Sequence, residues 1–155
     1  MTLRHPAGLL ATWFGAGLLP GAPGTWGSLA AVVLAWPLAR WGGGAALAGA
    51  AVACALIGWW AAALYARRSG RADPKEVVID EVAGQWLTLT ACPPDPLLYA
   101  VGFLLFRLFD IWKPWPVRLA DRAVKGGFGI MLDDMLAAIY AGAVLAALSL
   151  WRSLP

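Results

Sequence analysis

The acidic residues of this sequence that could do chemistry occur as pairs and at the ends of apolar stretches. Asp80-Glu81 and Asp133-Asp134 are consecutive pairs, and Asp110 closes an apolar run. Carboxylates crowded together in apolar surroundings repel one another unless they are protonated or bridged by a cation. A hard divalent ion with oxygen ligands, Mg²⁺ in the first place, is the simplest bridge. The pattern predicts a metal ion held among these five carboxylates, Asp80, Glu81, Asp110, Asp133 and Asp134.

A second set of residues has the chemistry needed to bind phosphate. The Gly- and Pro-rich loop PGAPGT (20–25) leads into a predicted helix, for which Thr25 suits the N-cap. Backbone N–H groups at such a helix start bind anions. The segment 107–125 (RLFDIWKPWPVRLADRAVK) supplies cations. The candidate phosphate ligands are therefore Gly24, Thr25, Ser28, Lys113, Arg118 and Lys125.

Each of these motifs also has a purely structural explanation. Asp80-Glu81 could interact with a helix dipole, and Asp110 could simply pair with Arg107 or Lys113 one turn away. The Gly-Pro loop could be only a turn. Asp133-Asp134 fit a structural role less well, because an apolar segment flanks the pair on both sides.

The composition indicates an integral membrane protein. Hydrophobic residues make up 61% of the 155 residues and charged residues 14%, with ten Trp, and the mean hydropathy is +0.68. A chain of this length is too small to bury so much apolar surface in a soluble core. We expect one domain (1–155), membrane lipids and no nucleic acid as partners, and no role for His5 or for a Cys54–Cys92 disulfide. The oligomeric state stays open.

The elements that must position these residues are predicted to be helices throughout. Residues 1–20 suggest a short interfacial or re-entrant helix, with a signal peptide as the alternative. Residues 77–112 allow either a single span near 97–112 or a short hairpin of 80–91 and 96–111. The remaining predicted elements are spans at 26–41, 45–66 and 130–151, glycine turns at 42–44 and 126–129, and an amphipathic interfacial helix at 114–125.

Basic residues favour the hairpin. It places the basic segments 67–75 and 113–125 on the same side of the membrane, where basic loops prefer the cytoplasm. Ten of the twelve Lys and Arg residues then lie inside. The prediction is an all-α membrane protein with four to five inserted helices, its N-terminus inside and its C-terminus outside. In this topology the acidic pairs and the PGAPGT loop meet at the cytoplasmic interface, facing phosphorylated lipid headgroups.

Three other functions fit the sequence less well than binding of a phosphorylated lipid. An ion- or proton-coupled transporter would carry ionisable residues through the depth of the bilayer, whereas here they cluster on one side. A CDP-alcohol phosphatidyltransferase would need a DGxxAR…GxxxDxxxD pattern, which the sequence lacks. A purely structural membrane protein leaves Asp133-Asp134 without an explanation.

Four motifs make the chain resemble the bacterial phosphatidylglycerophosphatase A family. They are PGAPGTWGS (20–28), DPKEVVIDEVAGQW (73–86), FRLFDIWKPWP (106–116) and GGFGIMLDDMLAAIYAG (126–142), and the similar region runs from about Leu9 to Leu148. The resemblance implies a Mg²⁺-dependent, multi-pass phosphatase of the bacterial inner membrane with its active site facing the cytoplasm. Its reaction would convert phosphatidylglycerophosphate to phosphatidylglycerol and inorganic phosphate.

The resemblance also implies roles for individual residues. Asp80, Glu81, Asp133 and Asp134 would be metal and catalytic carboxylates, and Gly24 and Thr25 would belong to the phosphate site. Asp110 and Lys113 form part of an FDxxKP-type motif. Whether water attacks the phosphorus directly or a carboxylate is phosphorylated first stays open.

Overall fold

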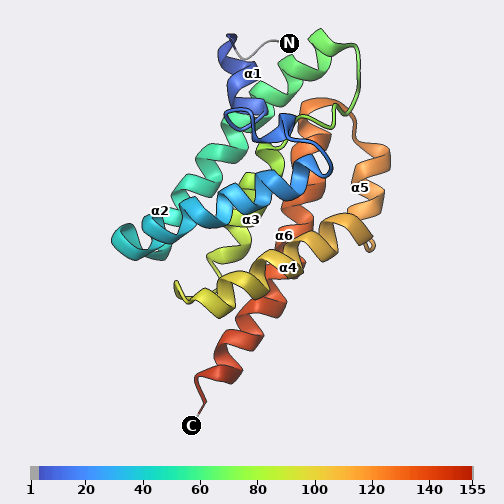
Figure 1. Cartoon of the computed structure of the whole chain (residues 1–155). Helices are drawn as coiled ribbons and strands as arrows, with labels where there is room; N and C mark the ends of the chain where they lie inside the picture. Colours follow the sequence, from blue (N-terminus) through green and yellow to red (C-terminus); the bar gives the residue numbers. More distant parts are fainter. Residues whose placement is uncertain (1–3, 155) are drawn as a thin grey trace.

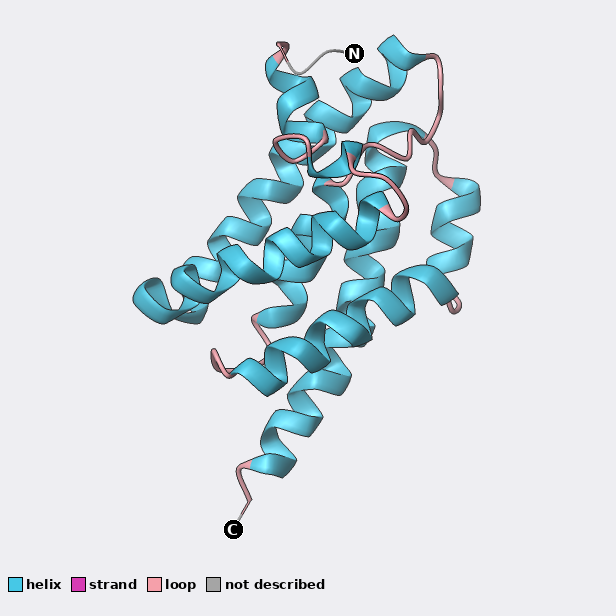
Figure 2. Ribbon diagram, viewed as in Figure 1, coloured by secondary structure: helices cyan, strands magenta, loops and turns pink. Residues whose placement is uncertain are grey.

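The computed structural model describes residues 4–154, which form helices joined by short loops with no strand among them (Figures 1 and 2). This confirms the all-α prediction. The elements are α1 Pro6–Ala11, the 3₁₀ helix η1 Ala16–Leu18, α2 Pro23–Ser69, α3 Ile79–Leu89, α4 Pro96–Trp112, α5 Val117–Ala123 and α6 Gly126–Arg152.

Helix α2 consists of two arms that meet at Gly43. The backbone there has φ 71° and ψ −179°, a conformation that an L side chain disfavours and glycine adopts freely. The chain turns back at this point (Figure 1), so residues 23–42 form a first arm and residues 44–69 a second. The glycine turn predicted at 42–44 is thus found where it was expected.

Two helices, α2 and α6, are long and apolar enough to cross a membrane, judged by length and composition. Helices α3 and α4 are the two arms of the predicted hairpin, and the loop between them covers the predicted turn at residues 92–95. Asp95 caps α4 by accepting a hydrogen bond from the Leu98 backbone N–H at 2.9 Å. Its carboxylate also pairs with Arg152 near the end of α6 at 2.8 Å.

Helix α3 is the buried centre of the molecule and packs against α2, α4 and α6. Val82, Ala83 and Leu89 are fully buried. Gly84 lies so close to its neighbours that an added Cβ would collide with the Phe106 ring of α4 and approach the Asp134 backbone carbonyl of α6. Such small residues let helix backbones approach closely, and this brings the acidic starts of α3 and α6 together.

Three local predictions were wrong. Residues 126–129 form the first turn of α6 and not a flexible turn, because Gly127 packs against the Ala63 backbone, where a Cβ would not fit. Helix α2 starts at Pro23 with Ala22 as its N-cap, so Thr25 lies within the helix. The interfacial helix covers only Val117–Ala123, since Pro114–Pro116 precede it as a turn.

The N-terminal segment and the loop before α3 hold the start of α3 in place. The Val78 backbone N–H donates to the Ala11 carbonyl at 2.8 Å. Arg71 and Glu76 form an ion pair within the loop at 2.9 Å. The hydrogen bond from Arg71 lowers the pKa of Glu76 below its usual value. Asp80 and Glu81 therefore begin α3 on an anchored backbone.

Candidate functional site

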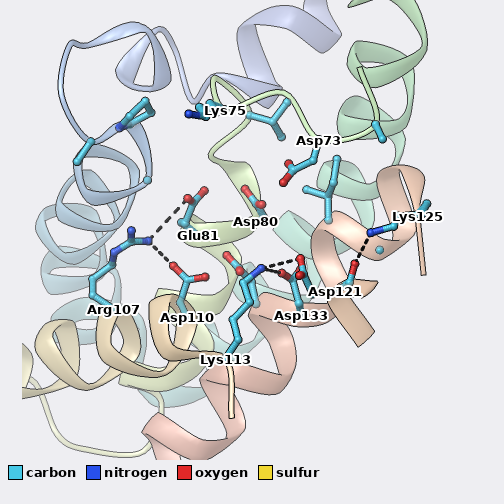
Figure 3. A pocket seen from close by; sticks show the side chains of 18 residues that line it. Asp73, Lys75, Asp80, Glu81, Arg107, Asp110, Lys113, Asp121, Lys125 and Asp133 are labelled. Atoms are coloured by element: carbon cyan, nitrogen blue, oxygen red, sulfur yellow. Dashed lines mark hydrogen bonds and ion pairs between the residues drawn. The ribbon is translucent and has the colours of Figure 1, made fainter. Parts of the chain in front are cut away.

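A charged pocket of about 360 Å³ lies where the start of α2, the start of α3, the end of α4, α5 and the start of α6 meet (Figure 3). Seven carboxylates and four cations line it, an excess of three negative charges. A site with this balance attracts cations and could accept an anion only together with them. The charged lining residues are Asp73, Lys75, Asp80, Glu81, Arg107, Asp110, Lys113, Asp121, Lys125, Asp133 and Asp134.

Three of the predicted metal ligands converge in this pocket. Asp80, Glu81 and Asp134 each offer one oxygen, and these oxygens all lie within 4.8 Å of one another. Asp80 is 8% exposed and Asp134 3%. One oxygen of each carboxylate is buried without a hydrogen-bond partner. Buried oxygens without donors are costly, about 1–3 kcal/mol each, and a cation shared among them removes that cost. The three residues could therefore bind a metal ion.

Asp133, the fourth predicted ligand, lies outside this group. Its Oδ2 pairs with Lys113 Nζ at 2.5 Å, and the same ammonium binds Asp121 Oδ1 at 2.7 Å. Consecutive side chains on a helix point about 100° apart, so Asp133 and Asp134 face different partners. Burial lowers the pKa of Lys113, but the hydrogen bonds from Lys113 to Asp121 and Asp133 outweigh it and raise that pKa above its usual value. Lys113 is therefore a permanent cation at the pocket wall.

Arg107 is a second cation of the pocket, between α3 and the end of α4 (Figure 3). Its Nη1 bonds Asp110 Oδ2 at 2.5 Å and lies 3.7 Å from Glu81 Oε1. Its Nε is buried without a partner. From the sequence, Arg107 is predicted as a partner of Asp110 and not as a ligand of the site. The signal that could have placed it in the site is its position in the same FRLFD motif, one helical turn before Asp110.

Gly24 brings the PGAPGT loop into contact with these charges. A Cβ on Gly24 would collide with Glu81 Oε1 and touch Arg107 Nη1. A side chain at this position would displace Glu81 and Arg107, so glycine lets the loop backbone lie directly beside them without moving either group. Gly24 lines the pocket together with its neighbour Pro23.

The other predicted phosphate ligands differ in position. Lys125 lines the pocket and donates to the Asp121 backbone carbonyl at 2.7 Å. Thr25 and Ser28 do not line it, and the buried Ser28 hydroxyl has no partner. Arg118 lies over a separate hollow beside Trp112 and donates to the Trp112 carbonyl at 3.3 Å.

Asp73 and Lys75, in the loop before α3, also line the pocket and were not predicted. One turn after Glu81, Gln85 is fully buried, and both polar atoms of its amide lack a partner. Asp73 and Lys75 belong to the DPKEVVIDEVAGQW motif, whose charged first half could have indicated them.

Comparison with known proteins agrees with these motifs. The family model described as Phosphatidylglycerophosphatase A matches residues 9–149. A Haemophilus influenzae protein named Phosphatidylglycerophosphatase A is 40% identical over 97% of this chain and 93% of its own length. An Escherichia coli protein of the same name is 39% identical over 94% of this chain and 84% of its own length.

A Bacteroides thetaiotaomicron relative, provisionally named as a phosphatidylinositol-3-phosphatase, is 39% identical over 92% of both chains. No solved structure matches the chain. The family model and the two relatives that share its name cover nearly the whole sequence, including all four motifs. The chain therefore belongs to the phosphatidylglycerophosphatase A family.

Proposed function

We propose that this protein hydrolyses phosphatidylglycerophosphate to phosphatidylglycerol and inorganic phosphate. The observation that carries the proposal is the group of three carboxylates, Asp80, Glu81 and Asp134, each with one buried oxygen that has no hydrogen-bond partner. Membership of the family and the names of two relatives support the choice of substrate. In the reaction water supplies an oxygen to phosphorus, and the bond from phosphorus to the lipid oxygen breaks.

Mg²⁺ is the ion that we assign to the carboxylate group. All of the donors are carboxylate oxygens, which suit hard cations, and the group contains neither the His nor the Cys that zinc prefers. When bound, Mg²⁺ would supply neutralising charge for the phosphoryl oxygens. Asp133 would act beside this group through Lys113, whose ammonium it shares with Asp121.

The cations and the loop would bind the phosphate itself. Arg107 and Lys113 present N–H donors on one wall of the pocket, and the Gly24 backbone lies against Glu81. Asp110 positions Arg107 through their hydrogen bond. Lys125 would attract the phosphate at the α5 side. Hydrogen bonds from a charged donor to phosphate are about twice as strong as hydrogen bonds between neutral groups.

We infer that the chain is a single domain (1–155) embedded in the bacterial inner membrane, with the pocket facing the cytoplasm. The two arms of α2, the hairpin of α3 and α4, and α6 would be inserted, in line with the expected four to five segments. Helix α5 would lie at the interface. Ten basic residues on the pocket side and only Arg40 and Arg152 on the other side support this orientation.

The test is phosphate release by the purified protein in detergent. We expect release from phosphatidylglycerophosphate with Mg²⁺ and none in EDTA. Asp134→Asn should abolish release while the protein stays folded. The matched control is Asp95→Asn, which keeps the cap of α4 at the far end of the molecule and should leave activity unchanged.

Full activity in EDTA or in Asp134→Asn would refute the metal–carboxylate mechanism. Phosphatidylinositol 3-phosphate is included as a second substrate because of the name of the Bacteroides relative. A higher kcat/KM for that lipid would reassign the substrate without changing the site.

A further inference from the structure

An apolar groove of about 720 Å³ runs along the surface between the first arm of α2 and α4. No charged residue lines it. Val33 on α2 and Leu104 on α4 are each 64% exposed, and both face this groove. Its walls include Leu29, Val33 and Trp36 of α2 and Tyr99, Ala100 and Leu104 of α4.

The groove starts next to the charged pocket. Leu29 is five residues after Gly24 on α2, and Leu104 is three residues before Arg107 on α4. Gly24 and Arg107 both line the charged pocket. With a rise of 1.5 Å per residue, these steps are only about 7.5 Å and 4.5 Å. The same two helices therefore form one wall of the pocket and both walls of the groove.

The groove extends over much of the depth of one leaflet of a bilayer. Its α2 wall runs from Leu29 to Trp36, a rise of about 10.5 Å, and half of a hydrocarbon core is about 15 Å. Near the far end, Trp36 and Tyr99 pack edge to face with ring centroids 5.4 Å apart, which joins the two helices. A flexible, unbranched and uncharged chain fits such a surface, because the lining is apolar apart from the Trp36 indole N–H and the Tyr99 hydroxyl, and that hydroxyl is buried.

We propose that this groove binds an acyl chain of the phospholipid whose phosphate enters the charged pocket. The proposal rests on the lipid phosphatase function proposed above. One occupant then spans both features, with its phosphate beside Arg107 and its tail along Leu29, Val33 and Ala100. The groove is a substrate-binding site that selects for chain length.

The experiment fills the groove from either wall. Ala100→Trp and Val33→Trp each place a large ring in it at an exposed position, where the fold can accept the added volume. Each variant is assayed with a dioleoyl and a dibutanoyl form of phosphatidylglycerophosphate. Ala100 is about 10 Å from Arg107 along the helix, beyond the reach of the short chains. We expect kcat/KM for the dioleoyl lipid to fall about tenfold or more, as for lost methylene contacts, with the dibutanoyl rate unchanged.

The matched control is Ala53→Trp, an exposed alanine on the second arm of α2 that does not line the groove. It should leave both rates unchanged. The groove is refuted by three results: unchanged dioleoyl kinetics in both variants, equal losses on both lipids, or a wild-type protein that does not prefer the longer chains. Failure of the wild-type protein to release phosphate from either lipid would instead refute the proposed function.

Discussion

Gly24 shows how a single backbone position controls the geometry of the site. Its Cα lies where any side chain would strike the carboxylate of Glu81 and the guanidinium of Arg107. The backbone of Gly24 is helical and unstrained, so the requirement for glycine comes from space and not from conformation. The residue therefore matters for the positions of Glu81 and Arg107 in the pocket more than for folding.

We predict that Gly24→Ala lowers kcat about 10²-fold, because shifting a catalytic group by about 1 Å has an effect of this size. The free energy of unfolding should change little. The matched control is Gly49→Ala on the same helix, where an added Cβ meets nothing within 4 Å. It should keep full activity and gain up to about 1 kcal/mol of stability. Kinetics and thermal unfolding of both variants provide the check, and a fully active Gly24→Ala would contradict the proposed place of the loop.

The sequence could predict which carboxylates gather but not how each is oriented. The predicted order of the helices places Asp80, Glu81 and Asp134 at one end of the molecule, and the structure confirms this. The division of labour between Asp133 and Asp134 depends on the rotation of α6 about its axis, and no residue pattern in the sequence reports that rotation. Arg107 was missed as a site residue for a similar reason, since its distance to Glu81 depends on how α3 and α4 pack.

At the scale of elements, an ion pair joins the start of α4 to the end of α6, at the end of the molecule opposite the pocket. Asp95 accepts the Leu98 N–H and pairs with Arg152. The hydrogen bond from the Leu98 backbone, followed by that from Arg152, lowers the pKa of Asp95 below its usual value. The pKa of Asp95 is lower in the folded state than in the unfolded state. The interactions of Asp95 therefore stabilise the fold fully above about pH 4, the ordinary aspartate pKa. The contribution is lost as the pH falls through the lower folded-state value.

We therefore predict that wild-type protein loses thermal stability between pH 6 and pH 3 by more than Asp95→Asn does. Asparagine keeps the cap but does not titrate. The difference between the two melting temperatures, measured in detergent, should shrink as the pH is lowered. If the difference between the two melting temperatures stays constant across this pH range, titration of Asp95 is not its cause.

Most of the helices could be predicted from the sequence. The wrongly predicted turn at residues 126–129 shows what one sequence does not reveal. Hydrophobic length and glycine turns located both arms of α2 and the hairpin of α3 and α4. Residues 126–129 were predicted as a turn because glycine favours turns. In the structure Gly127 is helical, since its missing side chain lets α6 touch the Ala63 backbone. A glycine kept for close packing and a glycine kept for a turn look the same in one sequence.

At the scale of the whole molecule, charge is divided unequally between the two ends. Seven of the nine acidic residues line the pocket, and Asp95 alone marks the opposite end with Arg152. Residues 41–66 of α2 contain no Asp, Glu, Lys, Arg or His. This distribution does not match the chain of charges through the bilayer that a transporter would need.

We predict that the two ends lie on opposite sides of the membrane. In a background of Cys54→Ala and Cys92→Ala, Arg71→Cys should react with an impermeant maleimide only after the cells are permeabilised. Ser153→Cys should react in intact spheroplasts. Both positions are exposed, so reactivity reports sidedness and not burial. The reverse labelling pattern would place the pocket outside the cytoplasm.

The groove between α2 and α4 also changes the work that catalysis requires. Moving an acyl chain from hydrocarbon into water costs about 0.8 kcal/mol per methylene. Suppose that an enzyme had to lift its lipid out of the bilayer far enough to expose five methylenes to water. This would add about 4 kcal/mol to the activation barrier and slow the reaction about 10³-fold. A groove that is open to the surrounding lipid along Val33 and Leu104 keeps the acyl chain in contact with apolar groups throughout the reaction. The lipid can then slide in and out within its leaflet, while the released phosphate departs into water.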